Sequence, residues 1–359
     1  MKNDKINILV AGCGNMGTSH ARAYHRLDSF NICGLVSRGP EKRERLSAEL
    51  GGLPTFDNYE KALEATQPDA VSINTYPGTH AQYAVRALEA GAHVFVEKPL
   101  AETIEDAEAV AAAARKANKK VLVGYILRHH PGWARFVEEG RKLGKPLIMR
   151  MNLNQQSTGK EWEVHKNLMD VMSPIVDCGV HYVDMMCEMT QANPVQVHAI
   201  GARLSADLKP GMYNYGQLQV VFDDGSSGWY ESGWGPMMSE TAYYIKDVIG
   251  PAGSVSILKN TFGRPRGQSA DILEHGIVDK LQVHHADTDE QGRLTKEDEI
   301  IPIENEPGHD ELCFLEQEYF LKAIKEDIDM SDHLKVAVQT LRIVLACDES
   351  VRTGRVVTI

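Results

Sequence analysis

Hydrophobic and polar positions follow two different rhythms along this chain, and the rhythm changes near residue 124. Before that point, short apolar runs alternate with longer segments of helical spacing. Strands and helices alternating in this way are typical of a doubly wound, Rossmann-type parallel sheet in an α/β fold. The predicted strands are Ile6–Ala11, Phe30–Val36, Asp69–Asn74, Val94–Val96 and Lys120–Gly124, and the predicted helices are Thr18–Leu27, a segment capped by Asp57, Ala81–Ala90 and Thr103–Ala117.

After residue 124 the pattern is that of an α+β domain with a large open, mainly antiparallel sheet. From Pro146 the chain alternates strictly, with Leu147, Met149, Met151 and Leu153 on one face and Arg150, Asn152 and Asn154 on the other, which predicts a half-buried strand. Further strands are predicted at Val195–Leu204, Gln217–Phe222, Ser227–Ser232 and Ser254–Leu258, with a hairpin signal at 222–226 and closing helices at Asp310–Ile324 and Lys335–Val351.

Two domains follow from these patterns: residues 1–124 and residues 125–359. The open sheet of the second has an apolar face that needs a cover. Another subunit could supply that cover, so we expect a homodimer or homotetramer formed through this sheet.

Bulk composition narrows the range of partners and compartments. The net charge of −12 argues against nucleic acid or an anionic membrane as the main partner. No apolar run approaches the roughly 18 residues of a membrane span, and the N-terminus lacks the pattern of a signal peptide. Six scattered cysteines without a C-x-x-C motif predict free, buried thiols. We therefore expect a cytoplasmic protein.

A glycine-rich turn follows the first predicted strand directly. Gly12-Cys13-Gly14-Asn15-Met16-Gly17 has the G-x-G-x-x-G spacing and stands between a strand and a helix. Gly12 allows the tight turn, Gly14 lets the backbone approach a pyrophosphate, and Gly17 allows close helix–strand packing. This context predicts dinucleotide binding, whereas the alternative is a merely tight turn.

The end of the second strand bears on which dinucleotide binds. An NAD-binding fold usually places an acid here, to bind the ribose 2′-hydroxyl. This chain instead has Ser37 and Arg38, with Lys42 and Arg43 one helical turn further on. A hydroxyl and a guanidinium suit a 2′-phosphate, so NADP is favoured. The alternative is that Arg38 is simply solvated and NAD binds without the acid.

Two more strand ends carry candidate residues. Thr75-Tyr76-Pro77 with His80 follows one strand, where the nicotinamide half of a dinucleotide should run. The next strand stops at the opposite charges of Glu97-Lys98, and Pro99 ends it. Ligands bind outside the carboxyl ends of strands in open α/β sheets, so Lys98 is well placed for chemistry. A solvated strand-end lysine is the alternative.

In the second half, one predicted helix carries an acid and a histidine. Ser173-Pro174 opens it, and Asp177 and His181, four residues apart, share a face. A carboxylate can orient an imidazole and raise its basicity, which suits proton transfer near neutral pH. The alternative is a surface pair. The adjacent histidine pairs at 129–130 and 284–285 lack metal-ligand spacing, so we expect no metal site.

Together these residues resemble the glucose–fructose oxidoreductase/inositol dehydrogenase (Gfo/Idh/MocA) family over essentially the whole chain. The resemblance rests on the glycine turn, the Pro77/His80 turn, the run from Ala90 to Pro99, and Asp177 with His181. It implies NAD(P) in the first domain and an open sheet used in oligomerisation in the second. It further implies a catalytic Lys98 and His181 assisted by Asp177, a sugar or polyol substrate, and a cis Lys98–Pro99 peptide. Ser37 departs from the acid of many members.

The interpretation that follows is an NAD(P)-dependent oxidoreductase acting on a hydroxyl or keto carbon of a sugar, inositol or sugar derivative. We expect Lys98, Asp177, His181, Arg128, Trp162 and His165 to contact the substrate, and Glu97 and Lys98 to join the residues above at the cofactor. One alternative retains and recycles the cofactor during epimerisation, elimination or glycoside cleavage. Another is a non-catalytic NAD(P)-sensing regulator.

Overall fold

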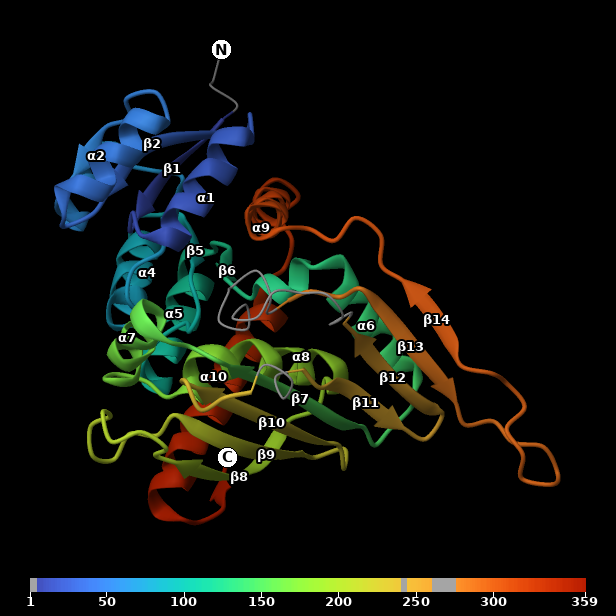
Figure 1. Ribbon diagram of the computed structural model, residues 1–359. Coiled ribbons are helices and arrows are strands. Elements are labelled where there is room, and N and C mark those ends of the chain that lie inside the picture. The colour runs from blue at the N-terminus through green and yellow to red at the C-terminus, as the bar shows by residue number, and fades with distance from the viewer. Residues whose placement is uncertain (1–4, 240–243, 260–275) are drawn as a thin grey trace. The chain divides into compact units, whose positions relative to one another are not determined.

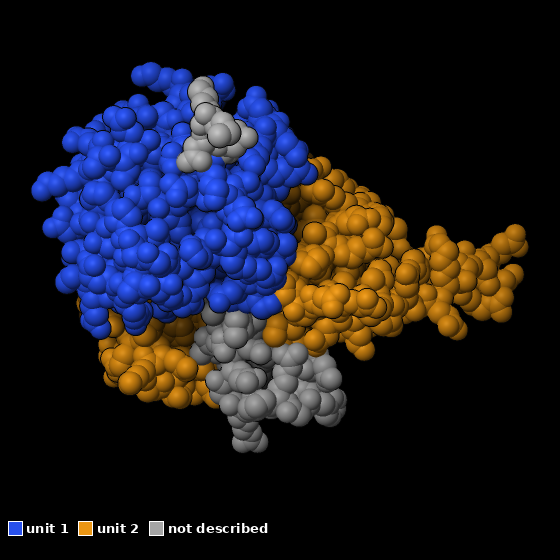
Figure 2. All heavy atoms as spheres, turned by 90° about the horizontal axis from the view of Figure 1, so that it is seen from above, with its two compact units in different colours: residues 1–129, 308–338 blue, residues 130–307, 339–359 orange. Residues whose placement is uncertain are grey.

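A computed structural model describes residues 5–239, 244–259 and 276–359. The chain divides into two compact units, coloured blue and orange in Figure 2. The first comprises Met1–His129 and Gly308–Val338, and the second comprises His130–Pro307 and Gln339–Ile359. Among the described residues, no helix combines the length and the apolar character that crossing a bilayer requires.

The first unit is built on a six-stranded sheet whose order is β3-β2-β1-β4-β5-β6 (Figure 1). Its neighbouring strands pair in parallel. The strand order reverses between β1 and β4, so the crevice that binds ligands in such sheets lies at their carboxyl ends. The strands are β1 Ile6–Ala11, β2 Phe30–Val36, β3 Thr55–Phe56, β4 Ala70–Ile73, β5 His93–Val96 and β6 Val121–Val123.

Helices alternate with these strands, as the periodicity predicts. They are α1 Asn15–Arg26, α2 Pro40–Glu49, α3 Tyr59–Thr66, η1 Pro77–Thr79, α4 His80–Glu89, α5 Ile104–Ala117 and η2 Ile126–His129. The cap of α3 is Asn58, whose side chain accepts from the Lys61 N–H at 3.0 Å. The prediction of Asp57 as the cap is wrong, because the side chain one residue later lies in reach of the free N–H.

A late helix completes the core of the first unit. α9 (His309–Lys325) packs against α1. Its Phe320 ring lies 6.5 Å from that of Phe30 and 6.3 Å from that of Phe95, measured between centroids. The compact unit therefore differs from the predicted division at residue 124, because its core includes side chains from residues 308–338.

The second unit contains a nine-stranded sheet of order β14-β13-β12-β11-β7-β10-β9-β8-β15. Its pairs are antiparallel except for β7 with β10, which confirms a mainly antiparallel sheet. The strands are β7 Ile148–Gln155, β8 Pro194–Ala202, β9 Tyr215–Phe222, β10 Ser227–Trp234, β11 Lys246–Gly250, β12 Gly253–Leu258, β13 Lys280–His285, β14 Glu299–Pro302 and β15 Val357–Thr358.

Helices cover one face of this sheet. α6 (Pro131–Lys142) packs on β11, β12 and β13, and α8 (Val180–Thr190) packs on β10. The remaining helices of the unit are α7 Gly159–Met169, the π-helical turn η3 Ile175–Gly179, and the later part of α10 Ser331–Thr353, which begins in the first unit. The predicted hairpin is confirmed: β9 and β10 pair antiparallel across a turn with Gly225 at φ 83°.

Strand β7 is more buried than its alternation predicts. Met149, Met151 and Leu153 are buried, as expected, but Asn152 and Asn154 are buried too. Their amides find partners on neighbouring chain segments: Asn152 Oδ1 accepts from the Ile245 N–H at 2.6 Å, and Asn154 donates to Glu231. The prediction of a polar, solvated face is therefore wrong for the second half of β7.

Candidate active site

The glycine turn lies at the switch point of the parallel sheet. Gly12 adopts φ 97°, and a Cβ there would lie 2.3 Å from the carbonyl oxygen of Asn74 at the end of β4. A Cβ on Gly17 would lie 1.9 Å from the carbonyl oxygen of Gly12. Gly14, by contrast, faces open space, and a Cβ added there would have no atom within 4 Å beyond its chain neighbours. Two glycines therefore close the turn, and the third leaves room for a ligand.

The beginning of α1 suits an anion. Gly14 is its N-cap and no side chain caps it, so its first N–H groups remain available to a ligand. Its first turn carries no acidic residue. A helix N-terminus of this kind attracts negative charge, so the residues present fit a dinucleotide pyrophosphate.

At the end of β2, two basic residues and a serine gather. Arg38 is exposed and Ser37 is half-buried. Arg43, on the first turns of α2, donates from Nη1 to the Ser37 carbonyl oxygen at 2.7 Å, and its side chain is only 15% exposed. The guanidinium of Arg43 thus holds the backbone from which Ser37 and Arg38 extend.

The turn after β4 is fixed by hydrogen bonds of its own. The hydroxyls of Thr75 and Thr79 lie 2.7 Å apart, whereas Tyr76 is 74% exposed. His80 is buried, and burial lowers the pKa of its imidazole. Its ring nitrogens lie 2.8 Å from the Pro99 carbonyl oxygen and 3.0 Å from that of Thr75. His80 therefore ties this turn to the segment that follows β5.

That segment carries the charged pair of the sequence. The Lys98–Pro99 peptide bond is cis, as the family resemblance implies, and Lys98 is half-buried. Glu97 is buried; its Oε2 accepts the Lys98 backbone N–H at 3.2 Å, and its Oε1 lies 2.7 Å from His20 Nε2. Lys98 thus stands at the carboxyl end of β5, next to β4 in the sheet.

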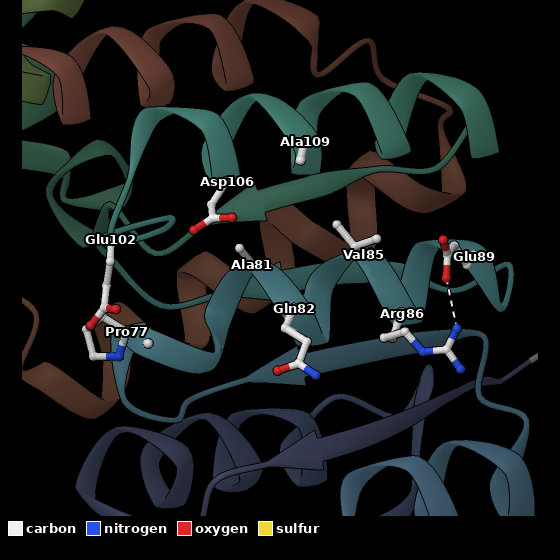
Figure 3. A pocket seen from close by; sticks show the side chains of 10 residues that line it. Pro77, Ala81, Gln82, Val85, Arg86, Glu89, Glu102, Asp106 and Ala109 are labelled. Carbon is white, nitrogen blue, oxygen red and sulfur yellow. Dashed lines mark hydrogen bonds and ion pairs between the residues drawn. The ribbon is translucent and has the colours of Figure 1, made fainter.

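A surface groove of about 320 Å³ lies beside the same turn, between α4 and α5 (Figure 3). Pro77 and Gly78 form one end, and Glu102 lies against Gly78. Its remaining lining comes from outward-facing residues of the two helices, among them Gln82 and Asp106. Of the residues predicted to bind cofactor, only Pro77 lines this groove. The groove is therefore separate from the sheet edge that carries Lys98.

In the second unit, Asp177 and His181 lie at the start of one helical segment. Ser173 Oγ accepts from the Val176 N–H at 3.2 Å, which confirms the predicted cap. Asp177 lies in the π-helical turn η3 and His181 in the first turn of α8, and both are half-buried. A Cβ on Gly179 would lie 2.8 Å from the Tyr230 ring on β10, so this glycine allows the turn to approach the sheet.

Other predicted substrate contacts divide between the units. His165 and Trp162 lie on α7 in the second unit, and both are buried. The His165 ring stacks on Trp234 with centroids 4.3 Å apart, and burial lowers its pKa to about 4 although the Asp177 charge opposes this shift. Arg128, by contrast, lies on η2 in the first unit, near the Tyr125 ring.

Two family descriptions match successive parts of the chain. Residues 6–125 match "Oxidoreductase family, NAD-binding Rossmann fold", and residues 134–256 match "GFO/IDH/MocA C-terminal domain". The chain belongs to the Gfo/Idh/MocA family. The match supports a nicotinamide cofactor, through the NAD-binding Rossmann fold of residues 6–125.

Named relatives resemble this chain over half or more of its length. The scyllo-inositol 2-dehydrogenase (NAD(+)) of Bacillus subtilis is 26% identical, over 93% of this chain and 92% of its own. The UDP-N-acetylglucosamine 3-dehydrogenase of Acidithiobacillus ferrooxidans is 30% identical over 55% and 58%. The structure of scyllo-inositol dehydrogenase from Lactobacillus casei, with NAD(H) and scyllo-inositol bound, superposes with TM-score 0.75 at 23% identity over 99% of each chain, and shares the fold.

Sequence reasoning misses several residues that contact the candidate site. His20 and Gln317, which bond to each other, lie 297 positions apart in sequence, and His20 also bonds to Glu97. Asn74, against which Gly12 packs, is predicted only as a strand end. A histidine three residues after the last glycine of the turn is the one available signal, and in sequence it is indistinguishable from an ordinary core position.

Proposed function

We propose that this protein is an NAD(P)-dependent dehydrogenase that acts on a hydroxyl or keto carbon of a sugar, inositol or sugar derivative. The observation that carries the proposal is the position of Lys98. It stands at the carboxyl end of β5, in the same parallel sheet whose β1 ends in the glycine turn. A bound nicotinamide would supply hydride acceptance or donation at this edge.

Each proposed catalytic residue has a separate task. In the oxidation direction, the His181 imidazole takes the proton of the substrate hydroxyl, and Asp177 orients that ring. The Lys98 ammonium stabilises negative charge that develops on the reacting oxygen, a contribution of about 3–4 kcal/mol for one well-placed donor. Trp162, His165 and Arg128 are proposed substrate contacts.

The cofactor residues follow the sheet edge. Gly12, Gly14, Asn15, Met16 and Gly17 hold the pyrophosphate, and Thr75, Tyr76, Pro77 and Glu97 line the path of the nicotinamide half. His80 contributes by holding the backbone, since both its ring nitrogens lie on carbonyl oxygens. Ser37 and Arg38 favour NADP over NAD, because a hydroxyl and an exposed guanidinium can bind a 2′-phosphate.

The open face of the second unit's sheet supports a homo-oligomer, a dimer or a tetramer. Ile148 and Ile249 are paired across β7 and β11, and both are exposed on the face opposite the helices. Ile200 on β8 is exposed as well. Ile148 and Ile249 form an adjacent exposed apolar pair on this face, and a patch of this kind supports an association surface. Light scattering on the purified protein, with Ile148→Lys as the variant, tests this assignment; a monomeric wild type contradicts it.

We place the protein in the cytoplasm, where its six free thiols would stay reduced.

A panel of sugars and polyols, followed at the absorbance of the reduced nicotinamide with both cofactors, tests the proposed function. Cofactor-linked oxidation of at least one polyol supports it. If instead the dialysed protein turns over a glycoside without added cofactor, a recycled cofactor replaces this proposal. Cofactor binding without turnover of any substrate, in either direction, identifies a regulator.

A further inference from the structure

A chain of buried hydrogen bonds crosses the first unit and ends at Glu97. The Tyr24 hydroxyl donates to Gln317 Oε1 at 2.7 Å, and Gln317 Nε2 lies 2.9 Å from His20 Nδ1. The other ring nitrogen, His20 Nε2, lies 2.7 Å from Glu97 Oε1. All four residues are buried, so none of these bonds competes with bulk water.

The partners determine which nitrogen of His20 carries the hydrogen. The Gln317 amide nitrogen is a donor only, and in this structure it is the amide nitrogen that lies beside His20 while the amide oxygen accepts from Tyr24. His20 Nδ1 is therefore the acceptor, and a neutral ring bears its hydrogen on Nε2 and donates it to Glu97. The ring also packs against Phe95 at 4.6 Å between centroids, which limits its rotation.

Glu97 also contacts the backbone of Lys98. Its second oxygen, Oε2, accepts the Lys98 backbone N–H at 3.2 Å. A Cβ on Gly124 would lie 3.2 Å from the same oxygen, so the carboxylate is enclosed on that side as well. Each oxygen of Glu97 thus has a donor, and the donor to Oε2 is the peptide N–H of the proposed catalytic lysine.

Charged and titratable groups from several elements interact with Glu97. Glu316 on α9 is buried, and burial together with the charge of Glu97 raises its pKa well above the ordinary value. Among the described residues, the groups that interact with Glu97 by hydrogen bonding or by charge include His20, Tyr24, His80, Lys98, Cys313 and Glu316. Of these, His20 places a ring nitrogen 2.7 Å from a carboxylate oxygen.

We infer that His20, held by Gln317, is a positioning residue that orients Glu97 and through it the Lys98 backbone. This inference rests on the proposed function for its effect on turnover. The inference gives α9 a role at the candidate site, although this helix lies far from the glycine turn and the strand ends in sequence.

Three variants test the inference. His20→Phe keeps the ring but removes both nitrogens, His20→Gln restores an N–H near the place of Nε2, and Gln317→Leu frees Nδ1 to take the hydrogen. Ser19→Ala is the matched control: it removes a hydrogen bond of 2.8 Å between the same two helices, from Ser19 to Asp310, that does not reach Glu97.

We expect kcat of His20→Phe to fall about 10- to 100-fold with little change in the KM of the cofactor, as small misplacements of a catalytic group do. Its pH profile should gain an acid limb, because Glu97 without its donor takes up a proton more readily. His20→Gln should recover most of kcat and lose the acid limb, and Gln317→Leu should show a smaller loss. Ser19→Ala should match the wild type in both kcat and the pH profile.

A readout without turnover separates this inference from the proposed function. The rate of reductive methylation of Lys98, measured by mass spectrometry, should rise in His20→Phe and not in Ser19→Ala. Faster methylation of Lys98 in His20→Phe, in a protein that shows no dehydrogenase activity, supports the inference and contradicts the proposed function. Unchanged methylation in a folded His20→Phe or Gln317→Leu variant, or a wild-type pH profile in an active one, overturns the inference.

Discussion

His80 Nδ1 lies 2.8 Å from the carbonyl oxygen of Pro99, and so joins the turn after β4 to the segment after β5. In His80→Phe an aromatic ring remains, but the carbonyl oxygen that accepts the His80 N–H loses its donor. An unsatisfied buried acceptor costs about 1–3 kcal/mol, so we expect a lower urea midpoint and weaker cofactor binding. Denaturant unfolding and fluorescence titration measure the two effects. His25→Phe, at an exposed position of α1, is the control; equal behaviour of the two variants contradicts the prediction.

Arg38 should distinguish the two nicotinamide cofactors. We expect Arg38→Ser to lower kcat/KM for NADP about tenfold or more and to leave that for NAD nearly unchanged, because only NADP carries a 2′-phosphate. Initial rates with both cofactors measure the ratio. Arg45→Ser removes an exposed arginine from α2 as a control for charge alone. A wild type that prefers NAD, or equal losses with both cofactors, counts against the proposed preference.

Two glycines of the same turn should respond differently to alanine. Gly17→Ala places a methyl group 1.9 Å from the Gly12 carbonyl oxygen, so we expect loss of stability even without ligand. Gly14→Ala meets open space, so we expect an unchanged thermal midpoint but weaker cofactor binding. Thermal unfolding and cofactor titration on both variants give the comparison. Normal cofactor affinity in Gly14→Ala would place the pyrophosphate elsewhere.

Loss of the Lys98 ammonium should affect chemistry more than binding. We expect Lys98→Met to retain cofactor affinity and to lose turnover by about two orders of magnitude or more. His181→Asn should lose turnover as well, because amides do not accept the hydroxyl proton near neutral pH. Single-turnover rates under saturating substrate measure both. Near-normal turnover in Lys98→Met removes Lys98 from the mechanism.

His165 should make the second unit sensitive to acid. Its pKa of about 4 in the folded chain is below the ordinary histidine value of about 6.5. A depressed histidine pKa means that the unfolded state binds the proton first as the pH falls. The contribution of His165 to the free energy of unfolding is therefore fully present above about pH 6.5 and is lost as the pH falls toward about 4. Between pH 7 and 5 the free energy of unfolding should fall by about 2 kcal/mol for this reason. Urea unfolding of the wild type should show a larger loss over this range than His165→Phe, which keeps the stack on Trp234; parallel losses contradict the assignment.

Local patterns predict most of the fold. β1 and β2 are predicted to the residue, because each is a short apolar run that ends at a glycine or a polar residue. β11, β13 and β14 are not predicted, since Lys280–His285 mixes charged and apolar residues and takes its strand form from pairing with β12. Pairing partners distant in sequence leave no mark on a local pattern.

The residues of the candidate site also divide into those that a local sequence pattern predicts and those that it does not. Gly12 and Lys98 can be found from the sequence because each stands just after a strand end, where an unexpected residue type is visible, and Gly17 follows from the glycine spacing that begins at Gly12. His20 cannot, because a buried histidine within a helix differs from a core residue only through its partners. Those partners are Glu97 and Gln317, and the latter is placed by packing of α9 that no local pattern specifies.

The position of α9 also has a consequence for synthesis of the chain. The core of the first unit includes Phe320, Ala323 and Met330. When a ribosome has released only residues 1–129, this core still lacks those side chains, and the His20 ring lacks Gln317. All but the last of the second unit's described strands emerge before α9 does. The first unit therefore reaches its complete fold only after residues 308–338 have been made, when the long segment 130–307 of the second unit has already emerged, so it cannot fold to completion on its own as soon as its first 129 residues appear.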